Sequence, residues 1–229
     1  MLKRSFQHPD ELDPVAQLVG DQEQTSPRQR VATVGYLMLK RFLDILVSLA
    51  LLALLLPLMV LISVVIRLSS PGPAIYCQKR LTDNGKIFTI FKFRTMSTDA
   101  ETESGAVWAD AADPRVTTIG RLLRHTRLDE LPQLLNVLVG DMSLVGPRPE
   151  RPELARELVR LLPDFERRTQ VKAGLTGLAQ IARGYASSLD DHREKLALDL
   201  AYIRGRSLWL DLQILVRTVL IVVTGRGAR

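Results

Sequence analysis

Apolar and polar positions divide the chain into three parts. Residues 1 to about 35 mix charged, Gln, Pro and Ser residues without a sustained period, which predicts a polar, disordered or loosely docked tail. Residues 36–68 hold the one long apolar run, from Phe42 to Ile66. Residues 69–229 alternate short apolar runs with charges and turn-forming residues, which predicts a folded domain outside the membrane. The first 30 residues have no apolar core with a cleavage site, so no signal peptide is predicted.

The apolar run indicates a membrane segment. At about 1.5 Å per residue it is long enough for a hydrocarbon core about 30 Å thick. Lys40 and Arg41 precede it and Arg67 follows it, and basic residues favour the cytoplasmic side at both ends. Pro57 near its middle removes a backbone hydrogen bond and predicts a kink or a break. Two interpretations stay open: a re-entrant hairpin that returns to the same face, and a tilted spanning helix.

A β-hairpin is predicted directly after the membrane segment. The runs AIYCQKRL and KIFTIFKFRTM are rich in aromatic and β-branched residues and flank a turn at Thr82–Gly85 that contains Asn-Gly. In the second run Lys92 and Arg94 are two positions apart, so they project from the same face of a strand. Charges at this spacing usually face solvent, and next to a membrane segment they are equally suited to lipid headgroups.

Helical signals dominate the rest of the chain. LPQLLNVLVGD has helical apolar spacing and a stop at Gly140, and further helices are predicted over 151–168, interrupted by Pro163, and over about 190–204. The C-terminal WLDLQILVRTVLIVV carries polar residues among large apolar ones, which is typical of a helix lying in the membrane interface. Residues 97–114 are acidic and predict a loop. The fold class predicted is α+β, mainly helical.

Charge and composition narrow the function. The chain has 31 Lys+Arg against 25 Asp+Glu, a net charge of +6, which suits nucleic acid, a phosphorylated substrate or an anionic membrane surface. The single Cys77 rules out an internal disulfide and a multi-cysteine metal site. The three histidines are scattered without metal-ligand spacing, so a zinc site is not predicted.

The segment 124–149, RHTRLDELPQLLNVLVGDMSLVGPRP, concentrates reactive groups. Asp129 and Glu130 precede a first-turn proline, and a helix N-terminus stabilises anions by about 0.3–1 kcal/mol per exposed group. Two adjacent carboxylates repel, so full ionisation needs basic neighbours, such as Arg124 and Arg127, or a bound Mg²⁺. A carboxylate kept ionised in this way can attack phosphorus. Taken alone, the pair is more simply interpreted as a charged helix cap.

The turn Pro147-Arg148-Pro149 changes this interpretation. A proline on each side restricts the backbone of Arg148, which suits a bidentate grip on phosphate. A helix start with two carboxylates, a stiff arginine turn and a nearby membrane segment together indicate a site for a lipid-linked phosphate.

From about residue 40 to residue 220 the sequence resembles the bacterial sugar transferases that are monotopic phosphoglycosyl transferases. The matching blocks are KRFLDILVSLALLALLLPLMV, SPGPAIYCQKR, FTIFKFRTM, DPRVTTIGRLLRHTRLDELPQLLNVLVGDMSLVGPRPE, AGLTGLAQ and SLWLDLQIL. Each block is modest evidence, but their common order makes a chance match very improbable.

The resemblance implies a two-step reaction. Asp129 would attack the β-phosphate of a UDP-sugar, expel UMP and hold the sugar phosphate covalently. A polyprenyl phosphate, undecaprenyl phosphate in most bacteria, would then take the phosphosugar. Glu130 matches the second member of the family's Asp-Glu dyad, which assists through a metal or proton transfer. The expected cofactor is Mg²⁺, bound by Asp129 and Glu130.

The expected phosphate-binding residues are basic and come from three of the matching blocks: Arg80, Lys92, Arg94, Arg124 and Arg148. The resemblance also favours a re-entrant membrane hairpin broken at Pro57, on the cytoplasmic face of the bacterial inner membrane, followed by a cytosolic catalytic domain over 69–229. The function implied is initiation of exopolysaccharide, O-antigen or other glycan assembly. The expected partners are a UDP-sugar, a polyprenyl phosphate and membrane lipid, with no nucleic acid, and a homodimer is left open.

Three matters qualify the resemblance. Thr82 stands where many members have glycine, and Ala173 stands where a proline is usual. No segment identifies the sugar, although the acidic loop 97–112 is a candidate. The alternative function is that of a membrane-anchored basic protein that binds nucleic acid or anionic lipid without catalysis and with a strong dependence on salt.

Overall fold

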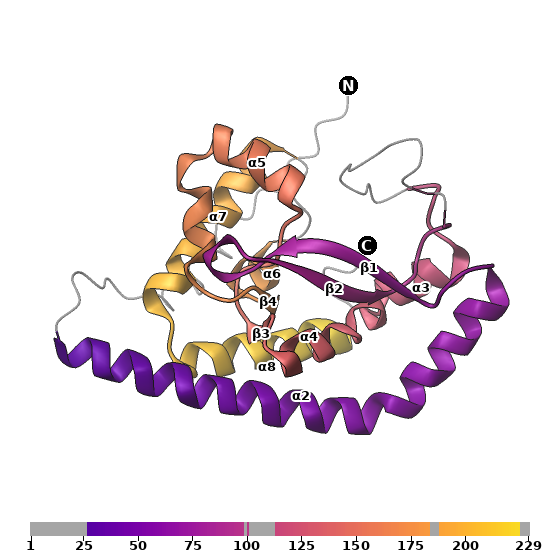
Figure 1. Ribbon diagram of the computed structural model, residues 1–229, viewed down its shortest axis with the longest axis horizontal. Coiled ribbons are helices and arrows are strands. Elements are labelled where there is room, and N and C mark those ends of the chain that lie inside the picture. The colour runs from indigo at the N-terminus through magenta and orange to yellow at the C-terminus, as the bar shows by residue number, and fades with distance from the viewer. Residues whose placement is uncertain (1–26, 99, 101–112, 184–187, 225–229) are drawn as a thin grey trace.

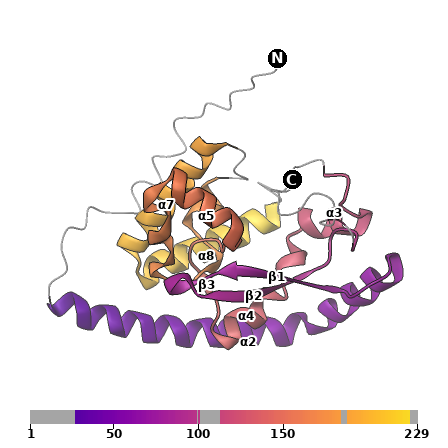
Figure 2. The same cartoon turned by 45° about the horizontal axis from the view of Figure 1, so that its top comes forward.

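The computed structural model describes residues 27–98, 100, 113–183 and 188–224, with side chains from residue 34 onward. One long helix, α2, runs beneath a mainly helical domain that contains two small sheets (Figures 1 and 2). The predicted fold class is confirmed at this level. Residues 1–26 of the predicted tail, and residues 99 and 101–112 of the acidic loop, lie outside the described residues.

The membrane segment forms one helix rather than two. Helix α2, Pro27–Ser69, continues through Pro57, and it bends without folding back on itself (Figure 1). The predicted break at Pro57 is therefore not confirmed. A proline removes one helical hydrogen bond and introduces a kink, but the flanking turns can remain helical. The helix also begins inside the predicted polar tail, and it ends at Ser69, just before the sequence Pro71-Gly72-Pro73, which cannot continue a helix.

Helix α2 exposes an extensive apolar surface. The stretch Val34–Ser69 is long and apolar enough to cross a membrane, and little of it is buried against the rest of the protein. Large side chains such as Phe42, Leu46, Leu54 and Leu61 are more than half exposed. An apolar surface of this size is unfavourable in water and indicates contact with lipid. Membrane association is supported, whereas the re-entrant path is not shown by the helix itself.

The N-terminal half of α2 is fastened to the domain by polar contacts. Lys40 Nζ lies 2.8 Å from an oxygen of Asp211 in α8, Leu208–Thr224. The guanidinium of Arg41 donates to the carbonyls of Val137 and Leu138 at the end of α4, Gln133–Val139. Cations at a helix C-terminus are favourable because unpaired carbonyls gather there.

The C-terminal half of α2 is held by the same domain. Ile62 and Ile66 are buried in a cluster with Phe93 and Leu123. The guanidinium of Arg94 then donates to the carbonyls of Ser70 and Pro71, where the chain leaves the helix. Both ends of α2 are therefore attached to one folded unit.

The predicted β-hairpin is confirmed. Strand β1, Ile75–Leu81, pairs antiparallel with β2, Ile87–Phe93, and Leu81 lies opposite Ile87. The turn places Asn84 at φ 54° and Gly85 at φ 69°. Asn and Gly tolerate this left-handed region better than other residues, which explains why Asn-Gly occupies the turn.

A second sheet was not predicted. Strands β3, Ser143–Val145, and β4, Gly174–Thr176, pair in parallel, and each has only three residues. A Cβ on Gly174 would lie 2.1 Å from the Gly146 nitrogen, so only glycine permits this approach. The glycines around position 174 favour a turn in a prediction from sequence. A strand of three residues is too short to show an alternating pattern that would indicate a sheet instead.

The helical elements largely follow the predictions. Pro152 opens α5 and Pro163 separates it from the following 3-10 segment, η4, while the short helix α6 was not predicted. Tyr202, Leu134 and Met142 are fully buried in the main core. The remaining elements are η2 Asp83–Gly85, α3 Thr118–His125, η3 Leu128–Glu130, α5 Pro152–Leu161, η4 Pro163–Gln170, α6 Leu178–Ala182 and α7 Leu189–Gly205.

Helix α4 is locked onto the hairpin by one buried side chain. Asn136 has no exposed surface; its Nδ2 donates to the Thr89 carbonyl at 2.7 Å, and its Oδ1 accepts from the Phe91 nitrogen at 3.0 Å. The amide thus pairs with the free edge of β2 as a neighbouring strand would. This contact sets the distance between the start of α4 and β2.

Helix α8 has two unlike faces, as predicted for a helix in a membrane interface. Leu210 and Ile214 are buried in the core, while Trp209, Val219 and Val223 are more than 60% exposed. Its exposed side chains extend the apolar surface of the protein beyond α2.

The two residues that depart from the family pattern touch each other. The Thr82 hydroxyl donates to the Asp141 carbonyl at 2.8 Å and accepts from the backbone nitrogen of Ala173 at 3.2 Å. Both residues are buried. A proline at position 173 would have no hydrogen to donate, so the threonine and the alanine form one compatible pair.

We expect Thr82→Val to destabilise the protein, because it keeps the shape of the side chain but removes the acceptor for the Ala173 nitrogen. A buried donor left without a partner costs roughly 1–3 kcal/mol. Chemical denaturation of the detergent-solubilised protein measures the effect. Thr169→Val, at an exposed hydroxyl that donates to a nearby carbonyl, is the control. Equal stabilities for the two variants would contradict the proposed coupling.

Candidate active site

The Asp-Glu pair lies in the turn that enters α4. Asp129 and Glu130 belong to η3, which follows the left-handed residue Arg127 and precedes Pro132 at the start of α4. The sequence placed the pair at or just before a helix N-terminus, and the structure confirms this position. Because η3 joins α3 to α4, the packing of both helices sets the position of the two carboxylates.

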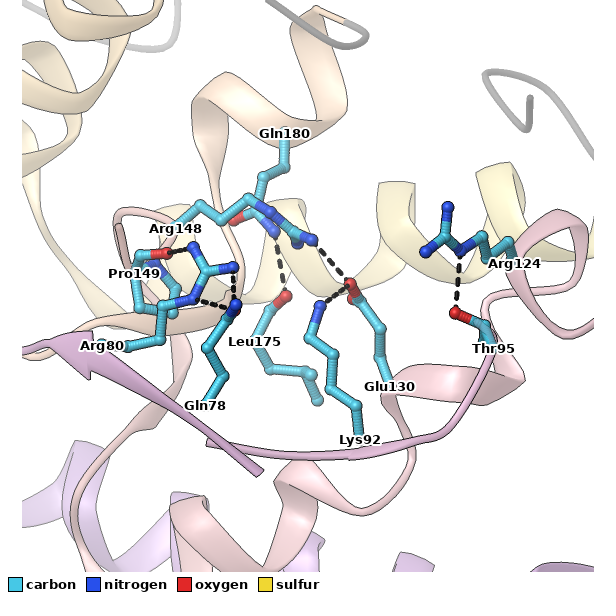
Figure 3. Close-up of polar contacts among 10 residues, drawn as sticks. All are labelled: Gln78, Arg80, Lys92, Thr95, Arg124, Glu130, Arg148, Pro149, Leu175 and Gln180. Carbon is cyan, nitrogen blue, oxygen red and sulfur yellow. Dashed lines mark hydrogen bonds and ion pairs between the residues drawn. The ribbon is translucent and has the colours of Figure 1, made fainter. Parts of the chain in front are cut away.

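Glu130 is a buried, doubly paired carboxylate (Figure 3). Its Oε1 accepts from Lys92 Nζ of β2 at 3.2 Å and from Arg148 Nη2 of the Pro-Arg-Pro turn at 2.7 Å. Burial opposes its ionisation, but the charges of Arg148 and Lys92 outweigh burial and hold the pKa of Glu130 well below its usual range. Glu130 is thus a permanent anion that fixes two cations.

Asp129 is in the opposite situation. Among the described residues it has no hydrogen bond or ion pair, and burial together with the neighbouring Glu130 raises its pKa to about 6. Lys92, Arg148 and Arg124 act in the other direction, because they favour the ionised form. Near neutral pH Asp129 is therefore mostly ionised, and its carboxylate oxygens accept no hydrogen bond from the described side chains.

Arg124 and Arg148 lie on either side of Glu130 (Figure 3). Arg124 is in the last turn of α3, and its Nε donates to Thr95 Oγ1 at 2.9 Å. The structure therefore brings four of the predicted basic or acidic groups together around Asp129: Glu130, Lys92, Arg148 and Arg124.

Two other predicted phosphate ligands serve the framework of the site. Arg80 donates from Nη1 to the Pro149 carbonyl at 3.0 Å and from Nε to Gln78 at 3.0 Å, and burial lowers its pKa to about 10. Arg94 is only 6% exposed and fastens the end of α2. Lys92 and Arg94 contact different groups, because Lys92 pairs with Glu130 whereas Arg94, the first residue after β2, binds the carbonyls of Ser70 and Pro71.

The Pro-Arg-Pro turn is held through its carbonyls. Arg80 binds the Pro149 carbonyl, and Arg168 donates from Nη2 to the Arg148 carbonyl at 2.9 Å. Arg168 Nε also donates at 2.7 Å to Asp199, a carboxylate that is 2% exposed. A fixed backbone leaves the Arg148 side chain few alternatives to its contact with Glu130.

Sequence reasoning missed the pair of Arg168 and Asp199. The two residues belong to η4 and α7 and are 31 positions apart, so no local pattern connects them. Asp199 does carry a signal, since it is a lone carboxylate within the apolar run LALDLAY. A charge at such a position is rarely buried without a partner.

Two cavities adjoin the turn. The larger, of about 680 Å³, lies between the hairpin turn, the Pro-Arg-Pro turn, α5 and η4. The smaller, of about 70 Å³, lies between Arg127, the turn, α6 and α7. Arg148 and Arg168 line both cavities, so the turn forms a wall that they share.

The carboxylate pair suits Mg²⁺ better than a metal that needs a complete protein cage. Among the described residues no cluster of three or more His, Cys, Asp or Glu could hold a metal ion. Mg²⁺ is commonly bound by one or two carboxylates while water and substrate phosphates complete its shell. Asp129, which has no partner in the described part of the chain, offers free oxygen ligands beside Glu130.

Comparison with known proteins identifies the family. The sequence pattern of the family described as bacterial sugar transferase matches residues 35–225. The chain belongs to this family. The resemblance of its ordered sequence blocks is thereby confirmed.

The relatives are similar to this chain over different shares of their own length. A UDP-glucose:undecaprenyl-phosphate glucose-1-phosphate transferase of Caulobacter vibrioides is 42% identical over 96% of this chain and 82% of its own length. An exopolysaccharide production protein of Rhizobium leguminosarum is 40% identical over 83% of this chain and 98% of its own length. A UDP-N-acetylgalactosamine-undecaprenyl-phosphate N-acetylgalactosaminephosphotransferase of Aeromonas hydrophila is 43% identical over 85% of this chain, but the match spans only 46% of that protein.

The raised pKa of Asp129 predicts a pH-dependent effect on stability. Its folded pKa lies above the ordinary value of 3.8, so ionisation opposes folding as the pH rises from about 4 to 6. Without divalent metal, the stability of Asp129→Asn relative to the wild type should therefore rise by roughly 1–3 kcal/mol between pH 4 and pH 7. Chemical denaturation at the two pH values measures this. Asp164→Asn, at an exposed carboxylate, should show no such rise, and a fall in the relative stability of Asp129→Asn over this range would contradict the prediction.

Proposed function

We propose that the protein transfers a sugar 1-phosphate from a UDP-sugar to a polyprenyl phosphate through a covalent intermediate on Asp129. The unequal dyad is the observation that carries this proposal: Glu130 is engaged by two cations, whereas Asp129 lies beside it without a partner in the described structure. The relatives named as UDP-glucose:undecaprenyl-phosphate glucose-1-phosphate transferases support the same reaction.

In the first step an oxygen of Asp129 attacks the β-phosphorus of the donor. A bond forms between this oxygen and phosphorus, and the bond from phosphorus to the oxygen that bridges the two phosphates breaks. The electron pair leaves with the bridging oxygen, which departs as part of UMP. Arg148 and Arg124 flank the dyad, so they are placed to bind phosphate oxygens and stabilise the charge of the transition state.

In the second step an anionic oxygen of the polyprenyl phosphate attacks the same phosphorus. The bond to Asp129 breaks, its electrons return to the carboxylate, and the sugar is left on a lipid diphosphate. No proton has to be supplied or removed, because both nucleophiles are already anionic. Glu130 contributes by holding Lys92 and Arg148 beside the reacting phosphate throughout both steps.

Asp129 and Glu130 are also the residues that would hold Mg²⁺. When bound, this ion would neutralise phosphate charge and polarise the phosphoryl group. Through this ion, the two carboxylates would hold the diphosphate of the donor close to the attacking oxygen.

The attachment of α2 to the domain supports a re-entrant arrangement in the membrane. Lys40 and Asp44 tie one half of the helix to the domain, and Ile62 and Ile66 tie the other half to it. A helix with both ends on one folded unit does not place those ends on opposite sides of a bilayer. We propose that α2 enters the cytoplasmic face of the bacterial inner membrane and returns to it, with its bend rather than a break at the turning point.

The alternative, a basic membrane-anchored protein without catalysis, has less support. It explains the net charge, but it assigns no purpose to a carboxylate whose pKa is raised beside one whose pKa is lowered. Two carboxylates with divergent pKa values in one site are typical of a catalytic centre.

Asp129→Asn should lower UMP release from a UDP-sugar, with Mg²⁺ present, by at least about a thousandfold while the protein stays folded and membrane-bound. An amide is a far weaker nucleophile than a carboxylate, so the covalent step is lost. With donor labelled in the β-phosphate and no lipid acceptor, label should stay on the wild type and be absent from Asp129→Asn. Asp164→Asn is the matched control. Full activity of Asp129→Asn would end the covalent proposal.

Topology can be tested with single cysteines. Cys77 is exposed beyond the C-terminal end of α2, and Gly35 near the other end has open space around it. We expect a membrane-impermeant maleimide to label native Cys77 only from the cytoplasmic side. The introduced cysteine of Gly35→Cys, in a Cys77→Ser background, should also be labelled only from that side. The Cys77→Ser protein alone is the blank. Labelling of the Gly35→Cys protein from the periplasmic side would instead support a spanning helix.

A further inference from the structure

The smaller cavity beside the dyad is lined mostly by cations. It has room for a single phosphate-sized group, about 70 Å³, and lies between the turn before η3, the Pro-Arg-Pro turn, α6 and α7. Its charged lining residues come from five separate segments of the chain: Arg127, Arg148, Arg168, Arg183, Lys195 and Asp199. Five positive groups surround one carboxylate, so the cavity has a large excess of positive charge.

Most of the negative charge near this cavity is already committed. Asp199 is bound by Arg168, and Glu130 by Arg148 and Lys92. Arg183 pairs with Glu194, but both side chains are well exposed, and such pairs contribute little.

Lys195 takes part in none of these pairs. In the described part of the chain it forms no hydrogen bond or ion pair, although it is only partly exposed. Burial, and then the charge of Arg148, lower its pKa, whereas the charges of Glu150, Asp191 and Asp199 raise it. A half-buried cation that makes no hydrogen bond in the described structure is stabilised when an anion binds beside it.

Gln180 supplies a second, independent indication of a ligand. Its Nε2 donates to the Leu175 carbonyl at 3.0 Å, which fixes the amide orientation. Its Oε1 is buried and has no partner among the described residues. Such an acceptor requires a hydrogen-bond donor, and a ligand hydroxyl is one. A nucleotide carries hydroxyls beside its phosphate, whereas a polyprenyl phosphate has none on its apolar chain.

The elements that line the cavity lie across the dyad from α2. In Figure 1, α7 lies on the side of the hairpin away from α2, and in Figure 3 Gln180 lies on the side of Glu130 away from Lys92. The apolar surface of α2, where a lipid phosphate would arrive, is thus across the site from Gln180 and α7.

We propose that this cavity binds the nucleotide phosphate of the donor, the one that departs with UMP, and that Lys195 contacts it directly. This inference rests on the proposed function and extends it. When the bridging bond breaks, the departing phosphate gains a negative charge, and Lys195 and Arg168 would stabilise that charge. Gln180 would accept a hydroxyl of the same nucleotide.

Binding of UMP to the purified full-length protein tests this proposal without turnover. Isothermal titration compares UMP with farnesyl phosphate, a short polyprenyl phosphate, in detergent micelles. Lys195→Gln should weaken UMP binding roughly tenfold to a hundredfold, as expected for loss of a charged hydrogen bond, and change farnesyl phosphate binding less than about twofold. Lys195→Arg should retain most of the affinity for UMP.

The matched control is Arg193→Gln, two positions away on the same helix, where the arginine is exposed and pairs with Asp190. It removes the same charge and should leave UMP binding unchanged. Equal UMP affinities for Lys195→Gln and Arg193→Gln, or a selective loss of farnesyl phosphate binding, would overturn the assignment. If Asp129→Asn were active but Lys195→Gln still lost UMP, the covalent mechanism would fail while the nucleotide site stood.

Discussion

The burial of the Glu130 charge is the constraint on which the site depends. A carboxylate removed from water is very costly unless cations reach it, and here they come from β2 and from the Pro-Arg-Pro turn. The positions of β2 and the Pro-Arg-Pro turn relative to η3 must therefore be accurate. Asn136 fixes α4 against β2, and Arg80 and Arg168 fix the turn, so the framework contacts and the charged contacts support one another. The asymmetry of the dyad follows, because cations committed to Glu130 leave Asp129 open.

Local signals in the sequence predicted most of the fold. The Asn-Gly turn, the start of α5 at Pro152 and the end of α4 at Gly140 all depend on residues that are neighbours in sequence. The uninterrupted course of α2 through Pro57 was not predicted, since a proline permits either a bend or a break and neighbouring packing selects between them. The β3–β4 sheet was also missed, because three-residue strands carry no period and pair across about thirty positions.

Site residues whose role depends on their type and order in the sequence were predicted. The roles of residues that depend on a contact with a distant part of the chain were missed. Asp129, Glu130 and Arg148 stand out through their order along the chain. Lys92 looked like one of several solvent-facing strand charges, and only the contact with Glu130, 38 positions away, gives it a role. Arg94 looked equivalent to Lys92, yet the strand ends between them, and the two side chains serve different parts of the molecule.

The contact between Thr82 and Ala173 has a consequence for how the chain could have diverged from relatives with glycine and proline at these positions. If alanine replaced proline at position 173 first, its buried N–H would have no hydrogen-bond acceptor, because a glycine at position 82 has no side-chain oxygen. A threonine arriving first would keep the Asp141 carbonyl as a partner for its hydroxyl. The less costly order is therefore threonine and then alanine. Chimeras that join the hairpin of one family member to the C-terminal half of another should respect the same pairing.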